Sequence, residues 1–142
     1  MKRNRNPLSR LLFLAYCVIM LWLLFGQRWK PELAFDSENI NLIPFYSIRY
    51  FIHLLQLDEY RKHAIINLFG NVIVFIPLGY LLPKIWARYR GIFKTIIAVS
   101  LMIVIVELLQ YATGLGSLDV DDYILNIFGT LIGCIVWKIK SA

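Results

Sequence analysis

Residues 116–137, GSLDVDDYILNIFGTLIGCIVW, decide the fold, because they join an acidic start to a long apolar run. Carboxylates stand at Asp119, Asp121 and Asp122, and no further charge follows before Lys138. Asp119 can cap a helix that begins here, because a carboxylate accepts hydrogen bonds from the free N–H groups of a first turn. The apolar remainder is long enough to be embedded in a membrane with some tilt or thinning.

One face of this expected helix carries polar or small side chains. The residues at positions i, i+4, i+7 and i+11 are Asp122, Asn126, Gly129 and Gly133, which share one stripe in helical register. An acid, an amide and two glycines are poorly suited to lipid. The stripe is therefore expected to meet protein or a ligand.

Composition indicates an integral membrane protein. The chain has 142 residues, which allows one domain (1–142), and 59% of them are apolar, with a mean hydropathy of +0.64. The net charge of +6 comes from basic residues clustered at the ends of apolar blocks, as cytoplasmic flanks are. No aromatic-rich polar surface remains for nucleic acid. Cys17 and Cys134 both lie in apolar blocks without metal-ligand spacing, so neither a metal nor a cofactor is expected.

Four apolar blocks predict an all-α, polytopic protein with about four transmembrane helices. They cover about residues 11–26, 64–82, 92–113 and 122–137. The basic N-terminal segment is followed by no small-x-small cleavage site, so the first block is expected to be an uncleaved span. Ten of the 15 Lys and Arg residues fall on the side that holds both termini. The positive-inside rule therefore predicts cytoplasmic termini in the cell membrane.

The long outer loop contains a predicted interfacial helix. Pro44 can start a helix after the turn that begins at Asn41. The apolar residues that then recur at helical spacing are Ile48, Phe51, Ile52 and Leu55. This segment is too short and polar to span, so it is expected at the outer interface. It either covers the mouth of the bundle or faces a ligand.

The predicted topology places the polar residues of the spans at one depth, in the outer half of the membrane. We therefore expect an acidic pocket that opens outward, with the candidate ligand-binding residues Asn41, Pro44, Asn67, Asn71, Glu107, Gln110, Asp119, Asp122 and Asn126. An ionisable residue inside a span is costly and rarely without a role. Structural alternatives exist: the amides can join helices, the aspartates can cap a helix, and Glu107 can be paired.

An internal similarity raises the question of a repeat. Residues 64–71, AIINLFGN, match 123–130, YILNIFGT, in their Asn, Phe and Gly. A true repeat would place two parallel helices with their Asn-x-x-Gly turns facing each other across a pseudo-two-fold axis. Chance similarity between apolar segments is the alternative.

The ordered motifs resemble the VanZ-like family. They are Asn41-Leu-Ile-Pro44-Phe45, Asn67-x-x-Gly70-Asn71-x-x-x-Phe75-x-Pro77-x-Gly79, Glu107-x-x-Gln110 and Asp119-x-x-Asp122-x-x-x-Asn126-x-x-Gly129-x-x-x-Gly133. The resemblance covers about residues 41–133. It implies a small bacterial membrane protein linked to low-level resistance to teicoplanin, a lipid-tailed glycopeptide antibiotic. Many members have a basic residue shortly before the first Asp of the last motif, where this chain has Gly116-Ser117.

Three functions are compatible with these patterns. The first is binding of a cell-envelope amphiphile, such as a lipoglycopeptide or a lipid-linked envelope precursor, in the outer pocket. The second is a membrane-embedded enzyme acting on a lipid-linked substrate, although no recognisable catalytic motif is present. The third is a structural subunit that packs against membrane lipids, a second copy or a partner membrane protein.

Overall fold

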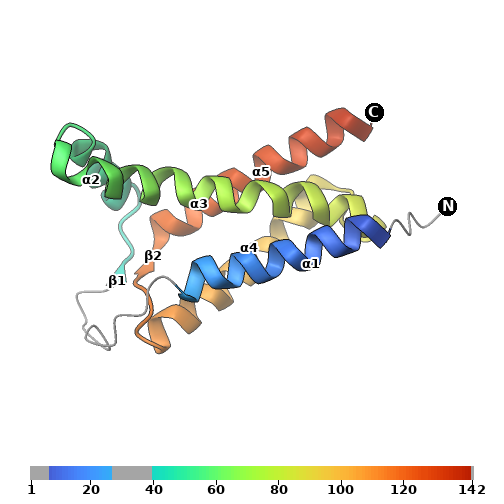
Figure 1. The fold of residues 1–142 in the computed structure, drawn as a ribbon, viewed down its shortest axis with the longest axis horizontal. Coiled ribbons are helices and arrows are strands. Elements are labelled where there is room, and N and C mark those ends of the chain that lie inside the picture. The colour runs from blue at the N-terminus through green and yellow to red at the C-terminus, as the bar shows by residue number, and fades with distance from the viewer. Residues whose placement is uncertain (1–6, 27–39, 142) are drawn as a thin grey trace.

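The computed structural model describes residues 7–26 and 40–141 (Figure 1). The helices, in chain order, are α1 (Pro7–Leu21), α2 (Tyr46–Leu54), α3 (Asp58–Ile85), α4 (Ile92–Ala112) and α5 (Val120–Ser141). Helix α1 continues into a π-helical turn, η1 (Trp22–Gly26), and a 3-10 turn, η4 (Ala87–Tyr89), links α3 to α4. Two short strands, β1 (Ile40–Asn41) and β2 (Leu118–Asp119), complete the elements.

Four of these helices are long and apolar enough to cross a membrane, namely 7–25, 58–85, 92–112 and 120–141. In Figure 1, α3 and α5 run in one direction, whereas α1 and α4 run in the other. The start of α1 and the end of α5 therefore lie at the same end of the bundle, and α2, β1 and β2 lie at the opposite end. Large apolar side chains are exposed along all four spans, among them Val18, Ile73, Leu101 and Ile135, as a lipid environment requires. The predicted all-α membrane architecture is confirmed.

Helices α3 and α5 form the most extensive pair in the described structure, and glycines set their separation. A Cβ added at Gly129 would stand 2.1 Å from the carbonyl oxygen of Val72, and one added at Gly133 would stand 2.1 Å from that of Ile76. From the other helix, a Cβ at Gly79 would stand 2.1 Å from the carbonyl oxygen of Thr130. The two backbones are therefore in direct contact. The predicted polar and small stripe of the last helix does meet protein.

The apolar core lies between α1, α3 and α4. Its buried members are Met20, Phe75, Leu78, Leu82, Val99 and Ile103. The hydroxyl of Tyr16 donates to the carbonyl oxygen of Val74 at 2.7 Å, which ties α1 to the middle of α3. This core holds α1, α3 and α4 together.

Several helix boundaries differ from the sequence prediction. Helix α3 begins at Asp58 rather than at residue 64, and it continues through Pro83 to Ile85. Asp58 and Glu59 in its first turn are favourable there because they face the positive end of the helix dipole. Helix α2 begins at Tyr46 rather than at Pro44, after Phe45 with a φ of 66°.

The two Asn-x-x-Gly turns lack the facing geometry that a true repeat would require. A Cβ added at Gly70 would approach only Ile66 of its own helix, at 4.0 Å. Gly129, its counterpart in the proposed repeat, instead contacts Val72. The two helices are parallel, as a repeat would require, but their similar turns do not face each other.

Candidate functional site

A short parallel bridge organises the end of the bundle that lies opposite the termini. Strands β1 and β2 pair in register, Ile40 with Leu118 and Asn41 with Asp119. This pairing holds the segment before α2 against the start of α5, although the two are far apart in the sequence. We call the residues that close this junction, Asn41, Ser47, Asp119 and Asp121, the polar latch.

Asp119 joins three segments through its carboxylate. Its Oδ1 atom accepts the backbone N–H of Asp121 at 2.8 Å, which is the predicted cap of the last helix. The same atom accepts the side-chain amide of Asn41 at 3.1 Å, and Oδ2 accepts the hydroxyl of Ser47 at 2.5 Å. The amide of Asn41 also donates to the oxygen of Ser47 at 3.0 Å, which completes a closed set of bonds.

Two members of the latch, Ser47 and Asp121, were not among the site residues predicted from the sequence, and Asp121 makes the longer-range contacts. Its side chain is buried, with 1% exposure. Its carboxylate accepts the backbone N–H of Phe45 at 2.6 Å and that of Ile48 at 3.0 Å. Helix α2 has no side-chain cap of its own, so Asp121 supplies the missing acceptor from another helix. Two features of the sequence could have indicated this role. The start of α2 has no residue that can cap it, and the start of α5 has more acids than its own cap needs.

Deeper in the bundle lies a second group, Asn71, Glu107, Asp122 and Asn126, which we call the inner polar set. The amide of Asn71 donates to Oδ1 of Asp122 at 2.5 Å, across the α3–α5 contact. Asn126 is 3% exposed, and within the described residues its Oδ1 accepts no hydrogen bond. A buried amide oxygen in this state is costly and marks a place where a donor would be favourable.

Glu107 lies near the end of α4, at the same end of the bundle as Asp122 at the start of α5. Thr95 of α4 contacts Cys134 of α5, and the two helices run in opposite directions. The same number of turns from that contact leads to Glu107 along α4 and to Asp122 along α5. Glu107 is buried, with 7% exposure. The inner polar set therefore combines two carboxyl groups and two amides inside an apolar bundle.

Three of the nine predicted site residues lie outside both groups. Asn67 donates its amide to the carbonyl oxygen of His63 in its own helix at 2.9 Å. Gln110 is buried and donates to the carbonyl oxygen of Leu24 at 2.7 Å, which fastens α4 to the end of the first span. Pro44 is exposed in the turn before α2.

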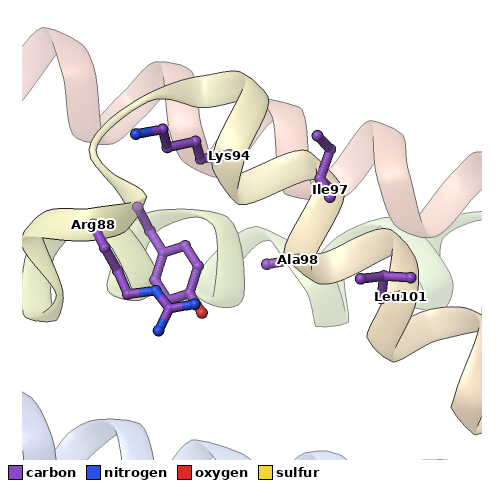
Figure 2. Close-up of a pocket in the computed structure, with 6 residues that line it drawn as sticks. Arg88, Lys94, Ile97, Ala98 and Leu101 are labelled. Atoms are coloured by element: carbon purple, nitrogen blue, oxygen red, sulfur yellow. The ribbon is translucent and has the colours of Figure 1, made fainter.

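Two cavities formed by the described residues lie at the other end of the bundle. The larger, of about 520 Å³, is lined by Arg88, Tyr89, Lys94, Ile97, Ala98 and Leu101 (Figure 2). The smaller, of about 310 Å³, is lined by Pro83, Lys84, Arg90, Trp137 and Ser141. The two ends thus differ in chemistry, because one carries carboxylates and amides and the other carries cations. An outward-opening pocket at the acidic end stays a prediction.

The fold and these two ends define a small polytopic helical membrane protein. The model of the VanZ/LLP1 family matches residues 12–141, and the chain belongs to that family. It is similar to Protein VanZ of Enterococcus faecium, with 28% identity over 137 residues that cover 94% of this chain and 76% of the relative. No solved structure matches the chain.

Proposed function

We propose that this protein binds a cell-envelope amphiphile at its acidic end and thereby contributes to low-level teicoplanin resistance in the cell membrane. Membership of the VanZ/LLP1 family and the similarity to Protein VanZ support the link to resistance. The observation that carries the binding proposal is the inner polar set, in which Glu107 and Asn126 are buried inside a membrane bundle.

The chemistry of this end suits a ligand with a polar head and an apolar tail. Carboxyl and amide oxygens accept hydrogen bonds from amines and sugar hydroxyls. A carboxylate within a span costs about 2.5–3.5 kcal/mol on insertion scales, and a bound donor would offset that cost. Tyr46, Tyr50 and Ile52 of the adjacent α2 are exposed and offer apolar surface for a tail. A lipoglycopeptide or a lipid-linked envelope precursor has both features.

The test is a resistance assay in a teicoplanin-sensitive Gram-positive host that expresses the wild type or one of three variants. Glu107→Gln and Asp122→Asn each remove one carboxylate from the inner polar set, whereas Lys138→Gln changes a charge at the opposite end. With equal membrane levels, the first two variants are expected to lose tolerance and the control to keep it. Wild type without tolerance, or tolerance retained in both carboxylate variants, would overturn the proposal.

A second candidate function is catalysis on a lipid-linked substrate. The position of Glu107 and Asp122 at the same end of the bundle favours it, since two carboxyl groups can serve as acid and base. Purified protein would then turn over an envelope lipid, and Glu107→Gln would abolish turnover but retain binding. Absence of any product from envelope lipids would leave binding as the function.

A further inference from the structure

The larger cavity has a cationic rim and an apolar wall. Figure 2 shows Arg88 on one side and Ala98 and Leu101 of α4 on the other, with Lys94 near the start of that helix. The guanidinium of Arg88 lies 4.7 Å from the centre of the Tyr89 ring, which holds it at the edge of the cavity. The cavity is at the basic end of the bundle, far from the inner polar set.

The cations of this rim lack anionic partners within the described residues. Residues 83–106 contain Lys84, Arg88, Arg90 and Lys94 but no acid. The nearest acid along α4 is Glu107, which the helical rise places about 20 Å from Lys94. Among the described residues, the ion pair that forms joins Arg61 to Asp58 at the start of α3, at the other end of the bundle. The rim therefore offers positive charge that no acid among the described residues neutralises.

The apolar wall continues along α4 for the depth of one leaflet. The residues at positions i, i+4, i+7 and i+11 on this face are Ile97, Leu101, Val104 and Leu108, and all are exposed. The stripe is about 16 Å long at helical rise, which matches half of a hydrocarbon core of about 30 Å. Lys94 lies in the first turn of α4, and therefore at the level of the lipid head groups.

We infer that this cavity and stripe bind an anionic phospholipid of the leaflet at the basic end. Arg88 and Lys94 neutralise its phosphate, and one acyl chain follows the stripe from Ile97 toward Leu108. Charge complementarity selects the anionic head group, because the rim has cations and no acid. The length of the stripe favours a lipid as the ligand, because a free anion would leave the apolar wall uncovered.

The test compares lipid binding by full-length protein in mild detergent, measured by native mass spectrometry. The probes are phosphatidylglycerol and phosphatidylcholine with the same acyl chains, and inorganic phosphate as a competitor. Wild type is expected to prefer phosphatidylglycerol by on the order of thirty-fold, since each cation at a membrane surface adds roughly five-fold in affinity. The double variant Arg88→Gln, Lys94→Gln is expected to bind both lipids alike.

Two further variants distinguish binding at this cavity from general attraction to the positive charge of this end. Lys138→Gln, Lys140→Gln removes the same charge from the basic end outside the cavity, and its preference is expected to stay within about two-fold of the wild type. Ala98→Trp fills the cavity without a change of charge and is expected to weaken phosphatidylglycerol binding. Variants are compared only where their thermal unfolding midpoints match the wild type.

Three results would overturn the inference. Equal binding of the two lipids by wild type would exclude head-group selection. An equal loss in the Lys138, Lys140 control would assign the preference to the overall charge of this end. Competition by inorganic phosphate at the affinity of the lipid would show that an anion alone occupies the rim. None of these outcomes bears on the proposed function at the acidic end.

Discussion

The carboxylate of Asp121 accepts the backbone N–H of Phe45 at 2.6 Å, although the two residues are 76 positions apart in the sequence. Phe45 stands immediately before α2 and has no side-chain acceptor to cap that helix. The first turn of α2 is therefore satisfied by an acid at the start of α5. This relationship couples the peripheral helix α2 to the spanning bundle.

Asp121→Asn is expected to lower the free energy of unfolding by roughly 1.5–3 kcal/mol, because it removes the charge from a buried side chain that accepts two backbone hydrogen bonds. Reversible unfolding in detergent measures this change, and hydrogen exchange at the amides of Phe45 and Ile48 should accelerate. The matched control is Asp58→Asn, whose ion pair with Arg61 is exposed and contributes at most about 0.5 kcal/mol. Unchanged exchange in α2 would show that the cap does not hold this helix.

Gly129→Ala is expected to force α3 and α5 apart, because the new Cβ would stand 2.1 Å from the carbonyl oxygen of Val72. A loss of more than about 2 kcal/mol is expected, as for overpacked sites in well-packed cores. Gly70→Ala is the control, since its Cβ would meet only Ile66 at 4.0 Å, and alanine favours a helix by about 1 kcal/mol. Thermal unfolding in detergent checks both, and equal midpoints would contradict the close contact.

The bond between Asn71 and Asp122 predicts energetic coupling between α3 and α5. A double-mutant cycle with Asn71→Ala and Asp122→Ala should give a coupling of about 0.6–1.7 kcal/mol, the range for hydrogen bonds between membrane helices. Asn67→Ala paired with Asp122→Ala should be additive, because Asn67 bonds to its own helix. Additivity in the first cycle would mean that the Asn71–Asp122 bond contributes nothing net.

The charge distribution predicts that the acidic end faces outward. In a background with Cys17→Ala and Cys134→Ala, Ile43→Cys should react with a membrane-impermeant maleimide on intact cells. Ser141→Cys should react only after permeabilisation, since the positive-inside rule predicts that the basic end faces the cytoplasm. Labelling in the reverse pattern would invert the topology and place the polar latch inside.

The sequence predicted a spanning helix well where its apolar segment and its backbone hydrogen bonds end at the same residues. Helix α4 was expected over residues 92–113 and is found at Ile92–Ala112. Helix α3 was expected to begin at residue 64, but it begins at Asp58. Hydropathy marks where a helix can contact lipid, whereas the backbone bonds of α3 continue through the polar turns 58–63. Such extensions carry no apolar signal.

The site was predictable only where the partner of a side chain is local. Asp119 caps its own helix, so its role followed from position. Asp121 accepts hydrogen bonds from backbone N–H groups at the start of α2, which is distant in the sequence. No residue in α2 indicates that its cap comes from another helix. Asn67 was placed in the pocket because the predicted topology puts it in the outer half of the membrane, but its amide bonds to the carbonyl oxygen of His63 one turn away. The pairing of β1 with β2 covers too few residues to leave an alternating pattern.

The order of synthesis gives the bond between Asp121 and Phe45 one more consequence. The ribosome makes α2 first and reaches its cap 76 residues later, which takes roughly 4–15 s at 5–20 residues per second. During that interval α2 has no acceptor for its first turn, and the strand before it has no partner. The acidic end is therefore completed only once the last helix enters the membrane, and a chain truncated before Leu118 would expose this unfinished surface to quality-control proteases.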